Sequence, residues 1–141
     1  MIEHLTRQLR RDEGVRAHLY FDSEGYATIG VGRLIDPRRG GGLRDHEIDY
    51  LLANDIEEAV AALRDRLPWF GALEPARQGV LANMAFNLGV DGLLGFKRTL
   101  ALVERGDYEA ASVEMLDSKW ARQVGRRADR LSEQMRTGRW V

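Results

Sequence analysis

Residues 11–32 read RDEGVRAHLYFDSEGYATIGVG, a stretch that sets acidic side chains, a threonine and four glycines among its apolar residues. The segments LYFD and YATIGVG have the aromatic and β-branched content of strands, and the SEG sequence between them is typical of a turn. The stretch therefore predicts a β-hairpin. Alternation along the second strand would place Thr28, Gly30 and Gly32 on one face, where the glycines allow another chain to approach closely.

A short amphipathic helix is predicted just before the hairpin. Ile2, Leu5 and Leu9 recur at the spacing of one helix face, and Gly14 is of the residue type that commonly ends a helix. Glu13 follows Leu9 by four positions, so it falls on the same face at the end of the helix. The helix would therefore deliver a carboxylate to the hairpin.

The remainder of the chain carries helical patterns. Residues 36–42, DPRRGGG, have the composition of a loop, and a continuous apolar stripe then predicts a long helix over about residues 44–66. Glu74-Pro75 opens the next helix, which stops at Gly89. Further helices are expected near residues 93–105, 107–117 and 126–137.

These elements predict an α+β fold, mostly α, in a single domain. A chain of 141 residues has the size of one domain. We expect a small N-terminal lobe with the β-hairpin over about residues 1–43, a connecting helix over about residues 44–66, and a larger all-α C-terminal lobe over about residues 67–141.

Composition argues against several classes of function. The formal net charge of −1 disfavours nucleic-acid binding, and the absence of cysteine excludes disulfides and thiolate metal sites. His4, His18 and His46 lack the spacing of metal ligands, so no metal or cofactor is expected. The first residues contain no apolar segment, so we expect neither a signal peptide nor stable membrane insertion.

Two carboxylates and a hydroxyl would meet at the predicted hairpin. Asp22 and Thr28 would lie on either side of its turn, and the preceding helix would bring Glu13 to them. Glycoside hydrolysis requires one protonated and one ionised carboxyl group. Desolvation on the apolar helix face would favour protonated Glu13, whereas Asp22 near an open turn would stay ionised. A structural interpretation is also open, with Glu13 facing solvent and Asp22 forming the turn.

The motif DEG followed by YFDSEGYATIGVG resembles the active-site segment of the phage-type lysozymes, glycoside hydrolase family 24. The segments NMAFNLG (83–89) and GFKRTL (95–100) are similar to the family's helix that lines the cleft in the large lobe. The segment KWARQVGRRADRLSEQMRTGRW (119–140) resembles its closing region. The resemblance covers nearly the whole chain.

This resemblance implies hydrolysis, with inversion, of the β-1,4 bond between N-acetylmuramic acid and N-acetylglucosamine in peptidoglycan. It assigns Glu13 as general acid, Asp22 as the residue that orients or activates water, and Thr28 as its helper. Arg127 matches an arginine near the acid. Positions that match substrate contacts are Leu34, Phe86, Asn87 and Thr99. For Phe86, packing in the core is an equal alternative.

Two features depart from the family pattern. Arg33 stands where relatives often carry a histidine, and the loop over residues 34–43 is short for the family, so the small lobe is trimmed. Asp55 lies within the apolar stripe of the predicted long helix, where an unpaired carboxylate would cost several kcal/mol. It therefore requires a cation, and we predict that Arg33 is its partner.

The resemblance also sets expectations for biology. We expect a monomeric endolysin that uses no cofactor, acts on peptidoglycan glycan strands, and binds no nucleic acid. It would wait in the host cytoplasm until a holin releases it to the periplasmic peptidoglycan. Two alternatives remain: a lytic transglycosylase, which cuts the same bond with a single acid, and a muramidase-like domain that binds glycan without catalysis.

Overall fold

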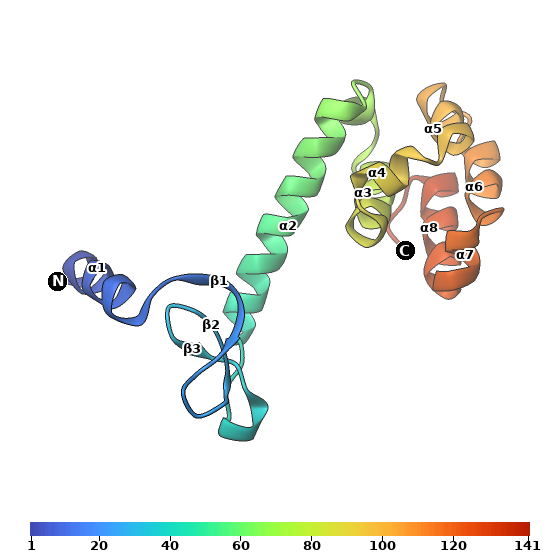
Figure 1. The fold of residues 1–141 in the computed structure, drawn as a ribbon. Coiled ribbons are helices and arrows are strands. Elements are labelled where there is room, and N and C mark those ends of the chain that lie inside the picture. Colours follow the sequence, from blue (N-terminus) through green and yellow to red (C-terminus); the bar gives the residue numbers. More distant parts are fainter. The chain divides into compact units, whose positions relative to one another are not determined.

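The structure, a computed structural model, describes all residues from Met1 to Val141, and the chain divides into two compact units, Met1–Leu51 and Leu52–Val141. Helix α2 (Asp45–Arg66) begins in the first unit and ends in the second (Figure 1). The first unit also contains α1 (Ile2–Glu13), β1 (Arg16–Phe21), β2 (Ala27–Gly30), β3 (Arg33–Leu34) and the 3₁₀ turn η1 (Pro37–Arg39).

The second unit is entirely helical. Its elements are η2 (Phe70–Ala72), α3 (Pro75–Leu88), α4 (Val90–Leu94), α5 (Lys97–Glu104), α6 (Tyr108–Leu116), α7 (Lys119–Val124) and α8 (Arg126–Thr137). The α+β, mostly α fold expected from the sequence is confirmed. None of the helices combines the length and the apolar character needed to cross a bilayer.

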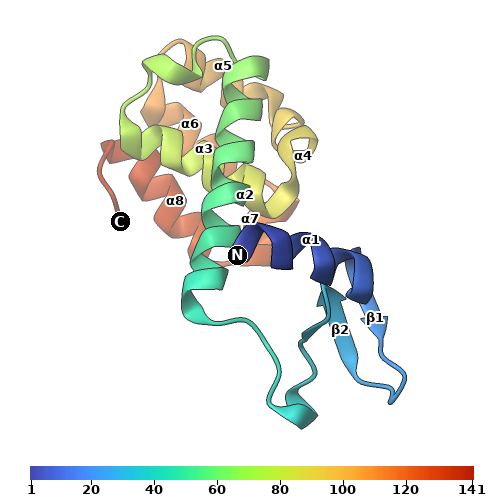
Figure 2. The same cartoon turned by 90° about the vertical axis from the view of Figure 1, so that its left-hand side faces the viewer.

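The sheet is antiparallel with the order β1-β2-β3, and its first hairpin is drawn clearly in Figure 2. Thr28 lies on the central strand, opposite Tyr20 of β1 and Leu34 of β3. The second predicted strand is shorter than expected, because the chain leaves β2 after Gly30 and turns back into β3. Both Gly30 and Gly32 have positive φ angles, of 71° and 65°, so they shape this turn instead of extending one strand face.

The first unit has no buried hydrophobic residue. Its buried residues are Thr28 and Asp36, each 4% exposed. Hydrogen bonds and ion pairs therefore organise this unit more than apolar packing does. That matters for function, because the predicted catalytic residues are all in this unit.

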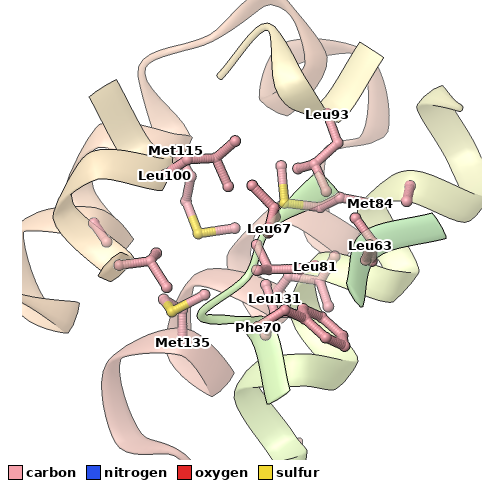
Figure 3. Packing of buried hydrophobic residues seen from close by; sticks show 14 of the residues in the cluster. Leu63, Leu67, Phe70, Leu81, Met84, Leu93, Leu100, Met115, Leu131 and Met135 are labelled. Carbon is pink, nitrogen blue, oxygen red and sulfur yellow. The ribbon is translucent and has the colours of Figure 1, made fainter. Parts of the chain in front are cut away.

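The second unit holds the hydrophobic core, in which the labelled side chains of Figure 3 point toward one another. Its fully buried members are Leu63, Phe70, Val80, Leu81, Met84, Leu93, Ala111, Met115 and Met135. From the predicted apolar stripe of the long helix, Leu63 reaches this core, whereas Ile48, Leu51, Leu52 and Ile56 are exposed. The C-terminal end of α2 thus anchors the helix to the core.

Most helix boundaries agree with the sequence. Pro75 opens α3 and Gly89 ends it, and Gly138 ends α8 in a left-handed conformation. The helix predicted over residues 93–105 is instead divided into α4 and α5. Helix α7 was not predicted: it has only six residues, and Ser118 caps it by accepting the Ala121 N–H at 3.0 Å.

Candidate active site

Asp22 lies directly after β1 and closes the hairpin turn. Its Oδ1 accepts the backbone N–H groups of Glu24 and Tyr26, both at 2.9 Å. Its own backbone N–H donates to the carbonyl of Tyr26 at 2.9 Å. One carboxylate oxygen therefore holds the turn, and the other, Oδ2, makes no hydrogen bond within the protein.

Thr28 is held from the same turn. Its hydroxyl donates to the carbonyl of Tyr26 at 2.9 Å, and its side chain is almost completely buried in the sheet. Because the hydroxyl proton is used, the lone pairs of Oγ1 can only accept from a further molecule. The backbone of Tyr26 thus anchors both Asp22 and Thr28.

Glu13 is the last residue of α1, and its side chain lies over the turn between β2 and β3. A Cβ atom on Gly32 would come within 3.0 Å of Glu13 Oε2. The side chain is exposed to solvent, so the desolvation expected from the apolar helix face is not present. No hydrogen bond joins Glu13 to Asp22 or Thr28. The first unit therefore holds all three predicted catalytic residues, with Glu13 at one turn and Asp22 at the other.

Arg33 has a different partner from the one predicted. Its Nη1 and Nη2 donate to Oε2 and Oε1 of Glu47 at 2.6 and 2.5 Å. Asp55 is exposed and lies eight residues beyond Glu47 on α2, about 12 Å further along the helix axis. A guanidinium bound to Glu47 in this way cannot also reach Asp55, which corrects the predicted pairing.

Glu47 is strongly held at the start of α2. In addition to Arg33 it accepts the backbone N–H of Arg44 at 2.8 Å, as in a capping box. Hydrogen bonds from Arg33, and secondarily from that N–H, lower the pKa of Glu47 to about 2. Glu47 was missed in the sequence, although a glutamate three residues after a loop end is a recognisable helix-start signal.

Asp36 and Arg38 were also missed, because their segment reads as an ordinary loop. Asp36 Oδ2 accepts the N–H of Ala27 at 3.0 Å, and its two oxygens accept Nε and Nη2 of Arg38 at 2.9 and 2.8 Å. The Arg38 hydrogen bonds, followed by that of Ala27, hold the pKa of Asp36 far below its usual range. The sequence signal was Asp-Pro, an N-cap followed by proline at the first position of a turn.

Phe86 and Arg127 line one apolar cavity of about 300 Å³ in the second unit. Phe86 is 50% exposed, so the alternative of core packing does not hold. Arg127 donates Nε to Asn83 Oδ1 at 2.9 Å and Nη2 to the carbonyl of the same residue at 3.2 Å. Asn83 was not singled out in the sequence. It fixes the arginine at the polar edge of this cavity.

Thr99 lines a second cavity, of about 550 Å³, whereas Asn87 does not line it and only binds Trp120 in its wall. Thr99 is 3% exposed. Asn87 is exposed, and its Oδ1 accepts the indole N–H of Trp120 at 3.0 Å. Trp120 lines the cavity and packs edge-on against Phe96, with ring centroids 6.0 Å apart.

The chemistry available in the first unit is acid–base chemistry. Asp22 and Thr28 are both bound to the backbone of Tyr26, whereas Glu13 lies beside Gly32 at the other turn of the same small sheet. No three histidine, aspartate or glutamate side chains gather in the geometry of a metal site. Leu34 belongs to the same sheet, directly opposite Thr28, whereas Phe86, Asn87, Thr99 and Arg127 belong to the helical unit.

Comparison with known proteins gives consistent matches. The family model described as phage lysozyme matches residues 10–137. The pre-baseplate central spike protein of Enterobacteria phage T4 is 32% identical over 95% of this chain, which spans only 28% of that protein's length. The probable T4-type lysozyme 1 of Dictyostelium discoideum is 27% identical over 98% of this chain and 96% of its own. A peptidoglycan hydrolase of Enterobacteria phage SP6 is 28% identical over 67% of this chain, which covers 10% of that protein.

Proposed function

We infer the reaction of this protein from its family: the chain belongs to the phage lysozymes, which are glycosidases. We propose that it hydrolyses peptidoglycan at the β-1,4 bond between N-acetylmuramic acid and N-acetylglucosamine. The relatives named as lysozymes and as a peptidoglycan hydrolase support this substrate. The observation that carries the proposal is the shared attachment of Asp22 and Thr28 to the backbone of Tyr26.

In the proposed reaction, Asp22 and Thr28 bind one water molecule. The water donates one hydrogen to the free Oδ2 of Asp22 and the other to Oγ1 of Thr28, whose own proton is bound to the Tyr26 carbonyl. A lone pair of the water oxygen is then left to attack the anomeric carbon. Asp22 takes the proton that the attacking water loses, which is general base catalysis.

Glu13 supplies the other half of the reaction. Its carboxyl group, held over Gly32, protonates the oxygen of the leaving sugar as the glycosidic bond breaks. The water becomes the new anomeric hydroxyl and approaches from the face opposite the leaving group. We therefore propose a single displacement, which inverts the configuration at the anomeric carbon.

Product analysis of purified peptidoglycan tests this reaction. Hydrolysis adds one water to each cut, and proton NMR of the first product should show the α-anomer. A 1,6-anhydro product, lighter by one water, would indicate a lytic transglycosylase instead. An initial β-anomer would show a double displacement, and glycan binding without any product would indicate a non-catalytic domain.

We propose that the biological setting is lysis of a bacterial host, with a monomeric enzyme that reaches peptidoglycan after a holin opens the inner membrane. The peptidoglycan hydrolase of Enterobacteria phage SP6 among the relatives supports peptidoglycan as the target in this setting. Induction in Gram-negative cells should give lysis only when a holin is co-expressed. Lysis without a holin would contradict the proposed release step.

A further inference from the structure

Two further residues, Asp36 and Arg38, bind the backbone of the segment between Asp22 and Thr28. Asp36, one of the two buried residues of the first unit, binds Ala27, which lies between Tyr26 and Thr28 in the chain. Its carboxylate accepts the N–H of Ala27 at 3.0 Å, and its backbone N–H donates to the carbonyl of Ala27 at 3.1 Å. Both polar groups of the Ala27 backbone are therefore bound to one residue.

Arg38, whose side chain is mostly exposed, binds both Asp36 and the hairpin turn. It binds the Asp36 carboxylate through Nε and Nη2, and the same Nη2 donates to the carbonyl of Gly25 at 3.0 Å. Its guanidinium carbon lies 5.0 Å from the centre of the Tyr26 ring, within cation–π range. Arg38 thus contacts two consecutive residues at the end of the hairpin turn, Gly25 and Tyr26.

The geometry of the Asp36 carboxylate leaves little freedom. It accepts four hydrogen bonds: the backbone N–H groups of Ala27 and Arg38, and the two guanidinium bonds. Its side chain is 6% exposed, whereas that of Arg38 is 65% exposed. A buried carboxylate with all of its bonds made is rigid, because any displacement leaves a polar group unpaired.

We propose that Asp36 and Arg38 are positioning residues for hydrolysis: they hold residues 25–27 so that the Asp22 carboxylate and the Thr28 hydroxyl face the same water. This rests on the proposed function of Asp22 and Thr28. Neither Asp36 nor Arg38 touches the reacting atoms. They act through the Tyr26 backbone, whose N–H binds Asp22 and whose carbonyl binds Thr28.

A displacement of about 1 Å at a reacting group can cost about 10²-fold in rate. Asp36→Asn keeps the size of the side chain but replaces one acceptor oxygen by a donor, so Ala27 or Arg38 must lose a bond. We expect kcat to fall at least tenfold with KM changed less than twofold, since the substrate-binding surface is not altered. Arg38→Met should give a similar loss, and Arg38→Lys, which keeps the cation, an intermediate one.

The experiment compares these variants with three controls on peptidoglycan, well below their unfolding temperatures. Arg7→Lys alters an exposed ion pair of the same unit, with Glu3 at 2.6 Å, and should behave as wild type. Val103→Ala creates a cavity in the other unit and should lower Tm without lowering kcat. Asp22→Asn tests the proposed role of Asp22 as general base. NMR of the Tyr26 amide reports whether the turn has moved.

The outcomes are distinct. A loss of kcat in folded Asp36→Asn or Arg38→Met, with a shifted Tyr26 amide, supports the proposal. Wild-type kcat in these variants, while Asp22→Asn is inactive, overturns the positioning role and leaves the proposed function standing. An active Asp22→Asn removes the proposed role of Asp22, and this inference with it, while peptidoglycan hydrolysis itself stands. If Asp36→Asn does not fold, the Arg38 variants decide, because that side chain is mostly exposed.

Discussion

Arg33 and Glu47 join the sheet to the first turn of α2 by two parallel hydrogen bonds, Nη1 to Oε2 at 2.6 Å and Nη2 to Oε1 at 2.5 Å. A bidentate pair of this kind has fixed geometry in addition to charge. Arg33 remains protonated at any ordinary pH, so only Glu47 can titrate in the range where the fold is studied.

This pair predicts how stability depends on pH. Hydrogen bonding to Arg33 lowers the pKa of Glu47 from 4.5 to about 2 in the folded protein. A depressed pKa means that the contribution is complete above the unfolded pKa and is lost as pH falls through the folded one. We expect Glu47→Gln to lower Tm equally at about pH 7.5 and pH 5.5, and by much less near pH 2.

Thermal unfolding of wild type, Glu47→Gln and Asp55→Asn at the three pH values checks this prediction. The Asp55 variant separates the two possible partners of Arg33. If Asp55→Asn shows the pH-dependent loss and Glu47→Gln does not, Arg33 is paired as the sequence suggested and not as the structure has it.

Glu13→Gln should lower kcat by about 10²–10⁴-fold, because the amide cannot donate the proton that the leaving oxygen needs. We expect Tm to stay the same or to rise, since catalytic acids are often retained at some cost to stability. Glu3→Gln, an exposed glutamate on the same helix, is the matched control and should keep full activity. Lysis by Glu13→Gln at the wild-type rate would remove this residue from the mechanism.

Gly32→Ala should impair activity beyond its effect on stability. Its φ of +65° makes any side chain strained by about 1–2 kcal/mol, and its Cβ would lie 3.0 Å from Glu13 Oε2. Gly106→Ala carries the same backbone strain, with φ of +81°, but meets nothing within 4 Å. Both variants should lose similar stability in urea unfolding, and only Gly32→Ala should lose kcat. Equal activity in the two would show that Glu13 need not lie against Gly32.

Arg77→Met should destabilise the helical unit by about 2–4 kcal/mol, because buried carbonyls would lose charged donors. Arg77 donates to the carbonyls of Met135 and Arg136 at 2.8 and 3.2 Å, which end α8, and its guanidinium lies 3.6 Å from the Tyr108 ring centre. Arg136→Met, at an exposed ion pair, should change stability by no more than about 0.5 kcal/mol. Chemical denaturation of both variants measures the difference, and similar values would show that Arg77 does not cap α8.

Phe86→Ala tests whether the exposed ring contacts substrate. Because Phe86 is 50% exposed, truncation should cost less than about 1.5 kcal/mol of stability, whereas Met84→Ala, at a fully buried site, should cost about 2–5 kcal/mol. We expect Phe86→Ala to raise KM while Met84→Ala, assayed well below its Tm, leaves KM unchanged. An unchanged KM in Phe86→Ala would exclude it from substrate binding.

The sequence alone determined the features that depend on neighbouring residues. Pro75, Gly89 and Gly138 marked helix ends correctly, because their backbone preferences act within one turn. The hairpin around Asp22 followed from its turn residues for the same reason. The candidate catalytic residues came from one short motif and its resemblance to the phage-type lysozymes, and their roles stay predictions until the variants are measured.

Only the tertiary structure decided the long-range pairings. Arg33 faces Glu47 because a third strand follows the Gly30–Gly32 turn and ends beside the start of α2, and no periodicity in the sequence signals a strand of two residues. Asp36 lies in a segment with the composition of a loop, yet in the folded chain it is buried against β2, where its carboxylate binds the N–H of Ala27. Arg77 caps α8, a helix that starts 49 residues later in the chain. A charged side chain can reach many partners along an unfolded chain, and the packing of distant segments selects one of them.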